Sequence, residues 1–505
     1  MGFTEKLKSF TNASERDGVQ YRTVTLPEMV CSMAHNGIMM CFYMLGMYAS
    51  YIGNAGYAIP VVTVSLILSV VGVFDGVTDA IAAAIFELMP PTRIGKIRVL
   101  MTIGWLMEAL ACLLLFAWTS DRFDGVVGMV VFVITYVLYT LGYTLCNVTA
   151  GTVAPVLTND PTQRPMMAFF DTAWSFGTPT IMNLVLTFTV LPKHNNQYDV
   201  GFFKEAIYIY IITSLVFLLI TFFGIRRSDV KETYTALSAE GGADADEKVT
   251  FKDMWSVLKS NRPVQMYMLT LASDKFAQSC ASQSVINVML AGILIGSYQA
   301  STLIGTFSSL IGLVGAFAGG LLIAKIGVKK ATSMWSWICI AVSAIMIVFC
   351  CILGKDGMSQ ISVAVVPTVI YIVLQIAVTA SKNILSVATS SMRGDVIDYE
   401  LERSGKYLPA IVNGIYSFIS KLIKSISTAL VGVMLGLIGY TTVMPQQGDK
   451  VTTSIFVMTL VIYFGFPIAG WLINVIAMKF YILDKERMIQ VHKNINARKN
   501  GEKID

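Results

Sequence analysis

Apolar runs long enough to cross a lipid bilayer recur along the whole chain, and polar breaks separate them. A transmembrane helix needs about 20 mostly apolar residues. The runs predict helices near residues 29–52, 57–86, 99–118, 126–155, 166–191, 203–225, 264–290, 298–323, 331–353, 360–391, 409–438 and 453–479. We therefore expect an all-α membrane protein with twelve transmembrane helices.

The small share of charged residues excludes most other classes of protein. Only 14% of the 505 residues are charged, whereas a soluble domain carries about 25%. The three histidines lie far apart in the sequence, and we find no nucleophile–histidine arrangement or metal-ligand cluster. The chain is thus predicted not to be an enzyme, to need no cofactor and to bind no nucleic acid, with membrane lipid as its surroundings.

The lysines and arginines predict the orientation in the membrane. If both termini lie on one side, that side holds 28 of the 37 basic residues and the opposite loops hold 5. Cytoplasmic loops carry the excess of basic residues. We expect a multi-pass protein of the cell (plasma or inner) membrane with both termini in the cytoplasm.

Polar segments divide the chain into two halves. The expected parts are a cytoplasmic N-terminal tail, a six-helix bundle, a cytoplasmic linker, a second six-helix bundle and a cytoplasmic C-terminal tail, at 1–28, 29–225, 226–263, 264–479 and 480–505. The end of the linker places four apolar side chains on one helical face, which predicts a short helix on the membrane surface: Phe251, Met254, Trp255 and Leu258.

A short internal repeat links the halves. The basic turn R-I-G-K-I-R at 93–98 follows the second predicted helix, and K-I-G-V-K-K at 325–330 follows the eighth. Two parallel six-helix halves joined by a long linker are the plan of the major facilitator transporters. The alternative is two unrelated positively charged cytoplasmic loops.

Ionisable residues inside the predicted helices are candidates for function, because burying them in lipid costs about 2.5–3.5 kcal/mol each on insertion scales. They are Asp75, Asp79, Glu108, Asp171, Asp274, Lys275, Lys382, Lys421 and Lys424.

The sharpest cluster is Asp75, Thr78 and Asp79, which share a helix face because residues three and four apart are neighbours. Two carboxylates one turn apart cannot both stay charged in a low dielectric without a cation. This predicts a site for a coupling ion, Na⁺ or H⁺, with Asp75 and Asp79 as the metal ligands if the ion is sodium. The alternatives are a structural pair neutralised by Lys421 or Lys424, and an effect of the helix end.

Four motifs resemble those of the glycoside–pentoside–hexuronide:cation symporter family, a branch of the major facilitator superfamily. F-D-G-V-T-D at 74–79, followed by 93–98, resembles its W-D-x-x-x-D-P…G-x-x-x-P signature, and D-V-I-D-Y at 395–399 resembles its D-x-x-D-Y motif. Y-T-L-C-N at 143–147 and S-K at 420–421 resemble its motifs in helices four and eleven.

The resemblance implies a cation site at Asp75, Thr78, Asp79 and Thr144, and a lysine at Lys421, with Lys424 as its rival. It places the family's sugar-site carboxylates near Asn36 and on Asn147, so a polyol remains possible while a neutral disaccharide fits poorly. Together with the residues' own chemistry, it gives these candidates for the substrate site: His35, Asn36, Asn147, Asp171, Trp174, Asp274, Lys275 and Lys421.

Several of these candidates have two interpretations. His35 is either a proton relay or a hydrogen-bonded interior residue, and Trp174 either stacks on a sugar ring or packs between helices. Asp274 and Lys275 form either an internal ion pair or solute contacts. A cytoplasmic gate between the halves is predicted at Arg393, Asp395, Asp398 and Arg403.

The predicted function is secondary active transport: symport of a sugar, glycoside or hexuronide with Na⁺ or H⁺ by alternating access. The partner is a small solute, and we expect a functional monomer. The alternatives are a carrier of the same fold for lysolipid or drug-like cargo, and a membrane receptor without transport.

Overall fold

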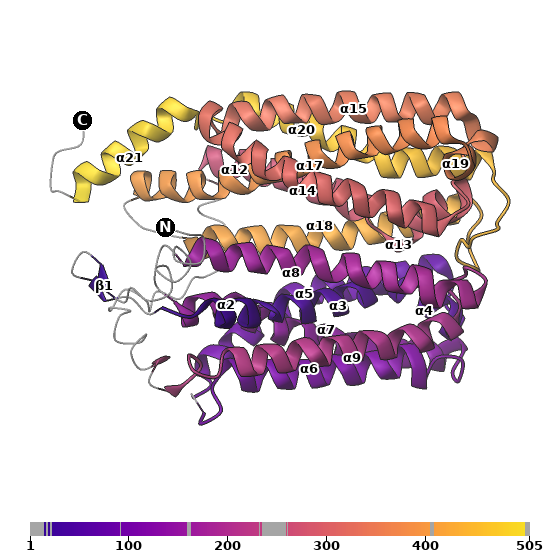
Figure 1. Ribbon diagram of the computed structural model, residues 1–505, viewed down its shortest axis with the longest axis horizontal. Coiled ribbons are helices and arrows are strands. Elements are labelled where there is room, and N and C mark those ends of the chain that lie inside the picture. The colour runs from indigo at the N-terminus through magenta and orange to yellow at the C-terminus, as the bar shows by residue number, and fades with distance from the viewer. Residues whose placement is uncertain are drawn as a thin grey trace. The chain divides into compact units, whose positions relative to one another are not determined.

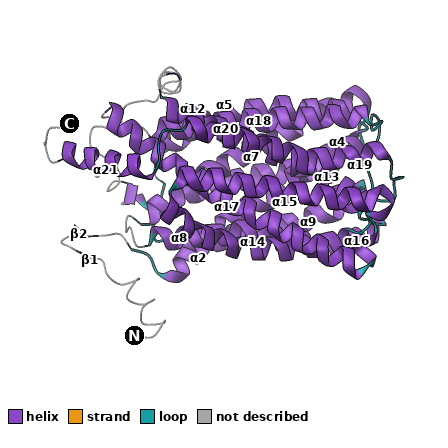
Figure 2. Ribbon diagram, turned by 90° about the horizontal axis from the view of Figure 1, so that it is seen from above, coloured by secondary structure: helices purple, strands orange, loops and turns teal. Residues whose placement is uncertain are grey.

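The computed structural model of the protein describes residues 15–16, 19–20, 23–90, 92–158, 163–231, 233–234, 259, 261–404 and 409–499. Nearly all of these residues are helical (Figure 2). One antiparallel pair of two-residue strands, β1 (Glu15–Arg16) and β2 (Val19–Gln20), precedes the first helix, with Arg16 opposite Val19. The all-α fold predicted from the sequence is confirmed.

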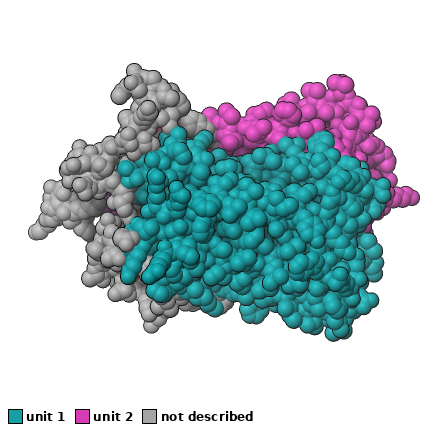
Figure 3. Space-filling model, turned by 60° about the horizontal axis from the view of Figure 1, so that its bottom comes forward, with its two compact units in different colours: residues 1–247, 442–444 teal, residues 248–441, 445–505 magenta. Residues whose placement is uncertain are grey.

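The chain divides into two compact units, which Figure 3 shows in different colours: residues 1–247 with 442–444, and residues 248–441 with 445–505. The helices of the first unit are α2 (Leu26–Met33), α3 (His35–Met47), α4 (Ala49–Tyr57), α5 (Val61–Leu88), α6 (Ile97–Leu113), α7 (Gly125–Leu157), α8 (Arg164–Val185) and α9 (Val200–Gly224). Short π-helical or 3₁₀ turns extend two of these helices: η1 (Leu114–Trp118) follows α6, and η2 (Leu186–Val190) and η3 (Leu191–His194) follow α8.

The second unit repeats this plan. Its helices are α12 (Arg262–Ala281), α13 (Ser284–Asn287), η5 (Val288–Leu294), α14 (Tyr298–Ile326), α15 (Val328–Gly357), α16 (Gln360–Val363), α17 (Val365–Ser404), α18 (Pro409–Leu437), α19 (Thr453–Leu460), η6 (Val461–Gly465), α20 (Phe466–Phe480) and α21 (Lys485–Lys499). Within each unit the long helices run side by side (Figure 1).

The two units use the same helix pairings. In the first unit α7 packs on α5 and α6, α9 packs on α3 and α6, and α8 packs on α3. In the second, α17 packs on α14 and α15, α20 packs on α12 and α15, and α18 packs on α12. If the helices are numbered by the six predicted spans of each half, these are the same five pairs. The repeat inferred from two short basic turns therefore extends through both bundles.

Long apolar helices with exposed apolar side chains identify a membrane protein. Among the described residues, nine helices are long and apolar enough to cross a membrane, and a tenth counts if one pair bent by 119° is a single span. The remaining predicted spans carry charges, such as Asp75 on α5 and Asp274 on α12. Large apolar side chains such as Val126 and Ile352 are each 78% exposed, and exposed apolar surface on this scale marks contact with a partner or with lipid.

The basic turn of the first unit is held by an acid from beyond α9. Asp229 is fully buried, and its carboxylate accepts hydrogen bonds from the backbone N–H groups of Lys96, Ile97 and Arg98 at 2.9–3.2 Å. These groups open α6 and have no partner within the helix. Arg98 adds an ion pair to the same carboxylate at 3.3 Å.

The glycine of this turn is required by its conformation and its surroundings. Gly95 has φ +108°, and a Cβ there would lie 2.1 Å from the Asp229 carboxylate. The matching turn in the second unit has Gly327 at φ +87°, and a Cβ there would lie 3.0 Å from Lys485, the residue that opens α21. Both turns thus meet the segment that follows the sixth helix of their own unit.

Two further features bear on the predicted ends of the segments. The tenth predicted helix, 360–391, is longer in the structure, because α17 continues to Ser404 and carries the charged motif at 393–400 as helix. The predicted surface helix at Phe251, Met254, Trp255 and Leu258 lies outside the described residues. The orientation of the termini and the five-part division stay predictions.

Candidate cation and solute sites

The four residues predicted to bind a cation lie together, on α5 and α7. The Thr144 hydroxyl donates a hydrogen bond to the Asp75 carboxylate at 2.9 Å. The hydroxyls of Thr78 and Thr144 are 3.4 Å apart, and Thr78 also donates to the Asp75 backbone carbonyl at 3.0 Å. Thr144 is buried, whereas Asp75, Thr78 and Asp79 are half-buried.

Helix geometry and helix packing each supply part of this cluster. The spacing of Asp75, Thr78 and Asp79 puts them on one face of α5, and that face meets α7 where Thr144 lies. The cluster offers carboxylate and hydroxyl oxygens, the ligand type that hard cations prefer. A carboxylate pair of this kind can also take up a single proton.

His35 and Asn36, at the start of α3, are both hydrogen-bonded within the first unit. The buried His35 ring lies 3.1 Å from the Thr149 hydroxyl through Nε2. The Asn36 amide donates to the Asp171 carboxylate at 3.1 Å and also contacts the Ser175 hydroxyl. Because α3 packs against α7 and α8, three residues predicted to bind the solute, His35, Asn36 and Asp171, form contacts between helices.

Trp174 has the contacts of a packing residue. Its indole N–H donates to the Val30 carbonyl at 3.1 Å, and its ring meets Phe217 edge-on with the centroids 5.3 Å apart. Asn147 is exposed on α7, one turn from Thr144. The structure brings Thr144 to Asp75, whereas no hydrogen bond or ion pair among the described residues involves the Asn147 side chain.

In the second unit the predicted acid of the seventh span is tied to the twelfth. The buried Asp274 carboxylate accepts a hydrogen bond from Asn474 of α20 at 2.8 Å, and Ser273 donates to the same asparagine side chain at 2.8 Å. Lys275 follows on α12, and Lys421 lies on α18, which packs against α12.

The residues predicted to form a gate lie on the last turns of α17. Arg393 donates to the Tyr267 hydroxyl at 3.2 Å, and its guanidinium stacks 3.8 Å from the centroid of the Tyr416 ring. Asp398 is 3.9 Å from His492 of α21. The other two predicted members lie nearby on the same helix, at Asp395 and Arg403, where Arg403 pairs with Glu400 at 3.0 Å. Their role as a gate between the halves stays a prediction.

Outside the spans, Tyr234 completes the Asp229 cluster. Its hydroxyl donates to the Asp229 carboxylate at 2.6 Å. Burial raises the pKa of the Tyr234 hydroxyl, and the adjacent carboxylate raises that pKa further. This cluster was not predicted from the sequence, because an acid 131 residues from Arg98 gives no local signal.

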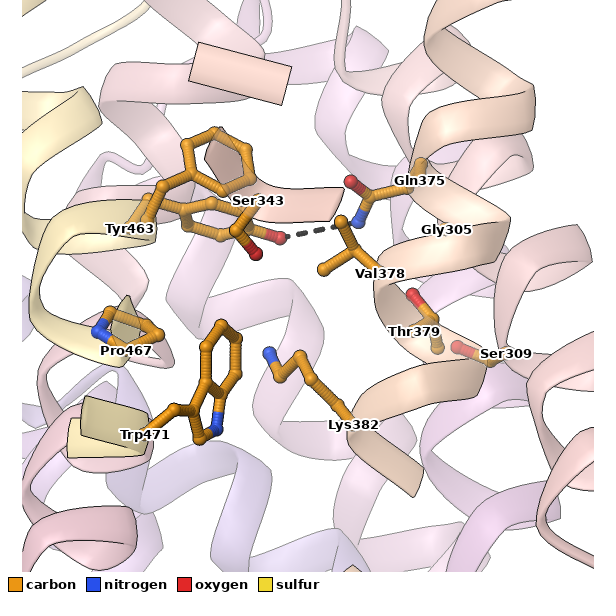
Figure 4. A pocket seen from close by; sticks show the side chains of 11 residues that line it. Gly305, Ser309, Ser343, Gln375, Val378, Thr379, Lys382, Tyr463, Pro467 and Trp471 are labelled. Atoms are coloured by element: carbon orange, nitrogen blue, oxygen red, sulfur yellow. Dashed lines mark hydrogen bonds between the residues drawn. The ribbon is translucent and has the colours of Figure 1, made fainter. Parts of the chain in front are cut away.

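Lys382 was identified from the sequence as an ionisable residue inside a predicted span, but no role was predicted for it. In the structure it lines a cavity of about 200 Å³ in the second unit, shown in Figure 4. The free-energy cost of placing a lysine in lipid is the signal that could have identified Lys382 as a functional residue.

Two six-helix units with repeated pairings and long apolar helices define the class of the protein: it is a membrane transporter of the major facilitator fold. The solved structure of the nucleoside transporter NupG has this fold, with a TM-score of 0.54 at 10% identity over 90% of this chain and 100% of that one.

The comparison of sequences gives the family. A family model described as MFS/sugar transport protein matches residues 30–485, and the chain belongs to this family. The resemblance to the glycoside–pentoside–hexuronide symporters is therefore confirmed.

The relatives of this chain include two proteins of Escherichia coli strain K12. YagG, named as a candidate glycoside/cation symporter, is 23% identical over 84% of each chain. A candidate sulfoquinovose importer is 24% identical over 73% of this chain and 71% of its own.

Proposed function

We propose that the protein is a symporter that couples entry of a small hydroxylated solute, a sugar, glycoside or hexuronide, to a gradient of Na⁺ or H⁺. The observation that carries this proposal is the 2.9 Å contact between Thr144 and Asp75, beside Thr78 and Asp79. It supports a cation site made by two helices rather than one. The name of YagG, a candidate glycoside/cation symporter, supports the same coupling.

The proposed mechanism is alternating access. The cation occupies the site on α5 and α7, and the solute binds at residues drawn from His35, Asn36, Asn147, Asp171, Trp174, Asp274, Lys275 and Lys421. Each ligand raises the affinity for the other by the same factor, because binding coupling is reciprocal. The loaded carrier then changes from one open side to the other, with the charged turns of α17 as the cytoplasmic gate, and no covalent step or cofactor is needed.

Within this class we propose an acidic solute over a neutral disaccharide. Asn36 and Asn147 stand where the resemblance places the family's sugar-site carboxylates, while Lys421 is kept and Lys275 is gained in the second unit. Fewer negative charges lower the electrostatic cost of binding an anion. The relative named as a candidate sulfoquinovose importer supports an acidic sugar derivative.

Uptake into proteoliposomes tests the proposal. Labelled glycosides and hexuronides are presented with and without an inward sodium gradient, and with and without an inward proton gradient. We expect one gradient to drive accumulation of at least one solute above equilibrium. Uptake that only equilibrates under every gradient would refute the cation coupling.

A second candidate, a lipid-like cargo, is favoured by one observation. The first unit has an apolar cavity of about 250 Å³ whose lining includes Val30, Phe170, Trp174, Ile181 and Phe217. A lysolipid acyl chain suits such a lining. Competition by lysolipid for solute uptake in the same proteoliposomes would support this cargo, and indifference to lysolipid would count against it.

A further inference from the structure

The second unit contains a polar cavity inside its own helix bundle. It measures about 200 Å³ and lies between α14, α15, α17, η6 and α20. Figure 4 shows the side chains that surround it. Its polar lining residues are Ser309, Ser343, Gln375, Thr379, Lys382 and Tyr463.

Lys382 is the charged group that lines this cavity. In Figure 4 its nitrogen points into the space beside the Trp471 ring. Among the residues that the structure describes, no hydrogen bond and no ion pair within 4.0 Å involves this ammonium. Removing an ammonium from water without pairing it is costly, so an anionic group in the cavity would offset that cost.

The neighbouring acid, Asp274, does not by itself neutralise the positive charge around the cavity. Asp274 and Lys382 both line a smaller adjoining cavity of about 20 Å³, but the Asp274 carboxylate is held by Asn474 at 2.8 Å. Asp274 interacts electrostatically both with Lys275, the next residue on α12, and with Lys382. Two lysines therefore face one carboxylate, which leaves one positive charge in excess.

The remaining walls supply hydrogen-bond donors. The buried Ser343 hydroxyl has no partner within the described part of the chain. The amide of Gln375 donates to the Tyr463 hydroxyl at 3.5 Å, so the tyrosine proton can be donated into the cavity. One ammonium and several hydroxyl donors suit a group that is negative and accepts several hydrogen bonds.

The size of the cavity suits a small molecule rather than a bare ion. A water molecule takes about 30 Å³ of liquid, so about 200 Å³ admits an acidic group with a few attached atoms. A Cβ on Gly305 would meet no atom within 4 Å, which confirms open space on the α14 side. The Trp471 ring offers an apolar face for the carbon skeleton of the same molecule.

We propose that this cavity is an oxyanion site in which Lys382 binds a carboxylate or sulfonate group. The proposal deepens the proposed function, on which it rests for the choice of an acidic solute as the occupant. A free inorganic oxyanion has the same chemistry, and the two sources are separated by the probes below.

Binding to the purified full-length protein in lipid nanodiscs tests this site by calorimetry. The probes are methyl β-D-glucuronide, its neutral counterpart methyl β-D-glucoside, and sulfate. For Lys382→Gln we expect glucuronide to bind at least about tenfold more weakly, which corresponds to about 1.4 kcal/mol, with a change below about twofold for the glucoside. Lys355→Gln is the control, because that lysine side chain is 42% exposed at the end of α15.

A second variant keeps the test decisive if Lys382→Gln fails to fold. Gly305→Leu fills the open side of the cavity without changing any charge, and it should weaken glucuronide binding to a similar degree. Glucuronide binding that sulfate displaces supports the solute as the occupant. Binding of sulfate alone that depends on Lys382 supports the oxyanion site with a free anion as its ligand.

The proposal is overturned if neither acidic probe binds the wild-type protein, if both variants bind the acidic probes normally, or if Lys382→Gln weakens the binding of glucuronide and glucoside equally. None of these measurements uses an ion gradient. The binding experiment therefore tests the oxyanion site alone, whereas the uptake experiment tests cation coupling, and a failure of one can be told apart from a failure of the other.

Discussion

The Thr144 hydroxyl of α7 donates a 2.9 Å hydrogen bond to the Asp75 carboxylate of α5. This contact joins α5 and α7, the second and fourth predicted spans, at the position where Thr78 and Asp79 share a face with Asp75. Helix packing therefore adds a second hydroxyl oxygen to a carboxylate pair set by sequence spacing.

Removing either carboxylate should uncouple transport. In Asp75→Asn and Asp79→Asn we expect normal insertion, because each change replaces a costly acid by a neutral residue of the same shape. Uphill accumulation of solute in proteoliposomes should be lost, whereas exchange between equal pools continues. Stimulation of solute binding by the cation should disappear in parallel, by reciprocity.

Asp121→Asn is the matched control for these variants, because that acid pairs with Lys204 in an exposed position at 3.3 Å. It should accumulate solute like the wild type. Wild-type accumulation in both Asp75→Asn and Asp79→Asn would show that the pair is structural and that the cation site lies elsewhere, with Asp171 and Asp274 the next candidates.

The Thr144 hydroxyl should contribute to cation affinity. A hydrogen bond to a charged group contributes about 1.5–3 kcal/mol, so Thr144→Val should raise the cation concentration for half-maximal uptake by about tenfold or more. Thr140→Val, one turn earlier, is the control, since within the described part of the chain the Thr140 hydroxyl donates to the Tyr136 carbonyl of its own helix. Equal effects of the two variants on cation affinity would exclude Thr144 from the site.

Lys421 should favour acidic solutes. If its ammonium attracts an anionic group, Lys421→Ala should weaken uptake of a hexuronide more than uptake of the matching neutral glycoside. Concentration dependence of initial uptake rates measures both. A similar loss for the two solutes would mean that this lysine acts through structure or coupling and not through the charge of the solute.

Gly95 should tolerate no side chain. At φ +108° alanine is strained by about 1–3 kcal/mol, and its Cβ would lie 2.1 Å from the Asp229 carboxylate that caps α6. Gly95→Ala should therefore lower the thermal unfolding midpoint of the purified protein more than Gly125→Ala does. Gly125 also has positive φ, at +56°, but no atom within 4 Å of an added Cβ, so equal shifts would contradict the role given to Asp229.

Both termini should lie in the cytoplasm. A reporter fused after Asp505, or inserted at Gly242 in the predicted linker, should be active only in that compartment, because the basic residues are concentrated on this side. An enzyme that is active only in the cytoplasm, paired with one that is active only outside, measures this directly. Activity outside at either position would refute the topology.

The sequence by itself determined the positions of the helices and the class of protein. In lipid each backbone N–H and C=O must be satisfied within its own helix, so the apolar runs and the charged breaks between them define the spans locally. The face shared by Asp75, Thr78 and Asp79 follows for the same reason, since helical spacing is a local property. The family motifs added Thr144, which spacing alone cannot connect to α5.

Only the tertiary structure decided which of the other polar residues meet. Asp274 is held by Asn474, 200 residues later, and Asp229 caps α6 across 131–133 residues. Trp174 packs on Val30 and Phe217, and Lys382 faces a cavity bounded by four other elements. Such contacts depend on which helix faces pack together and at what depth. The mean hydropathy of a span does not contain this information, because it is the same however the helix is rotated about its axis.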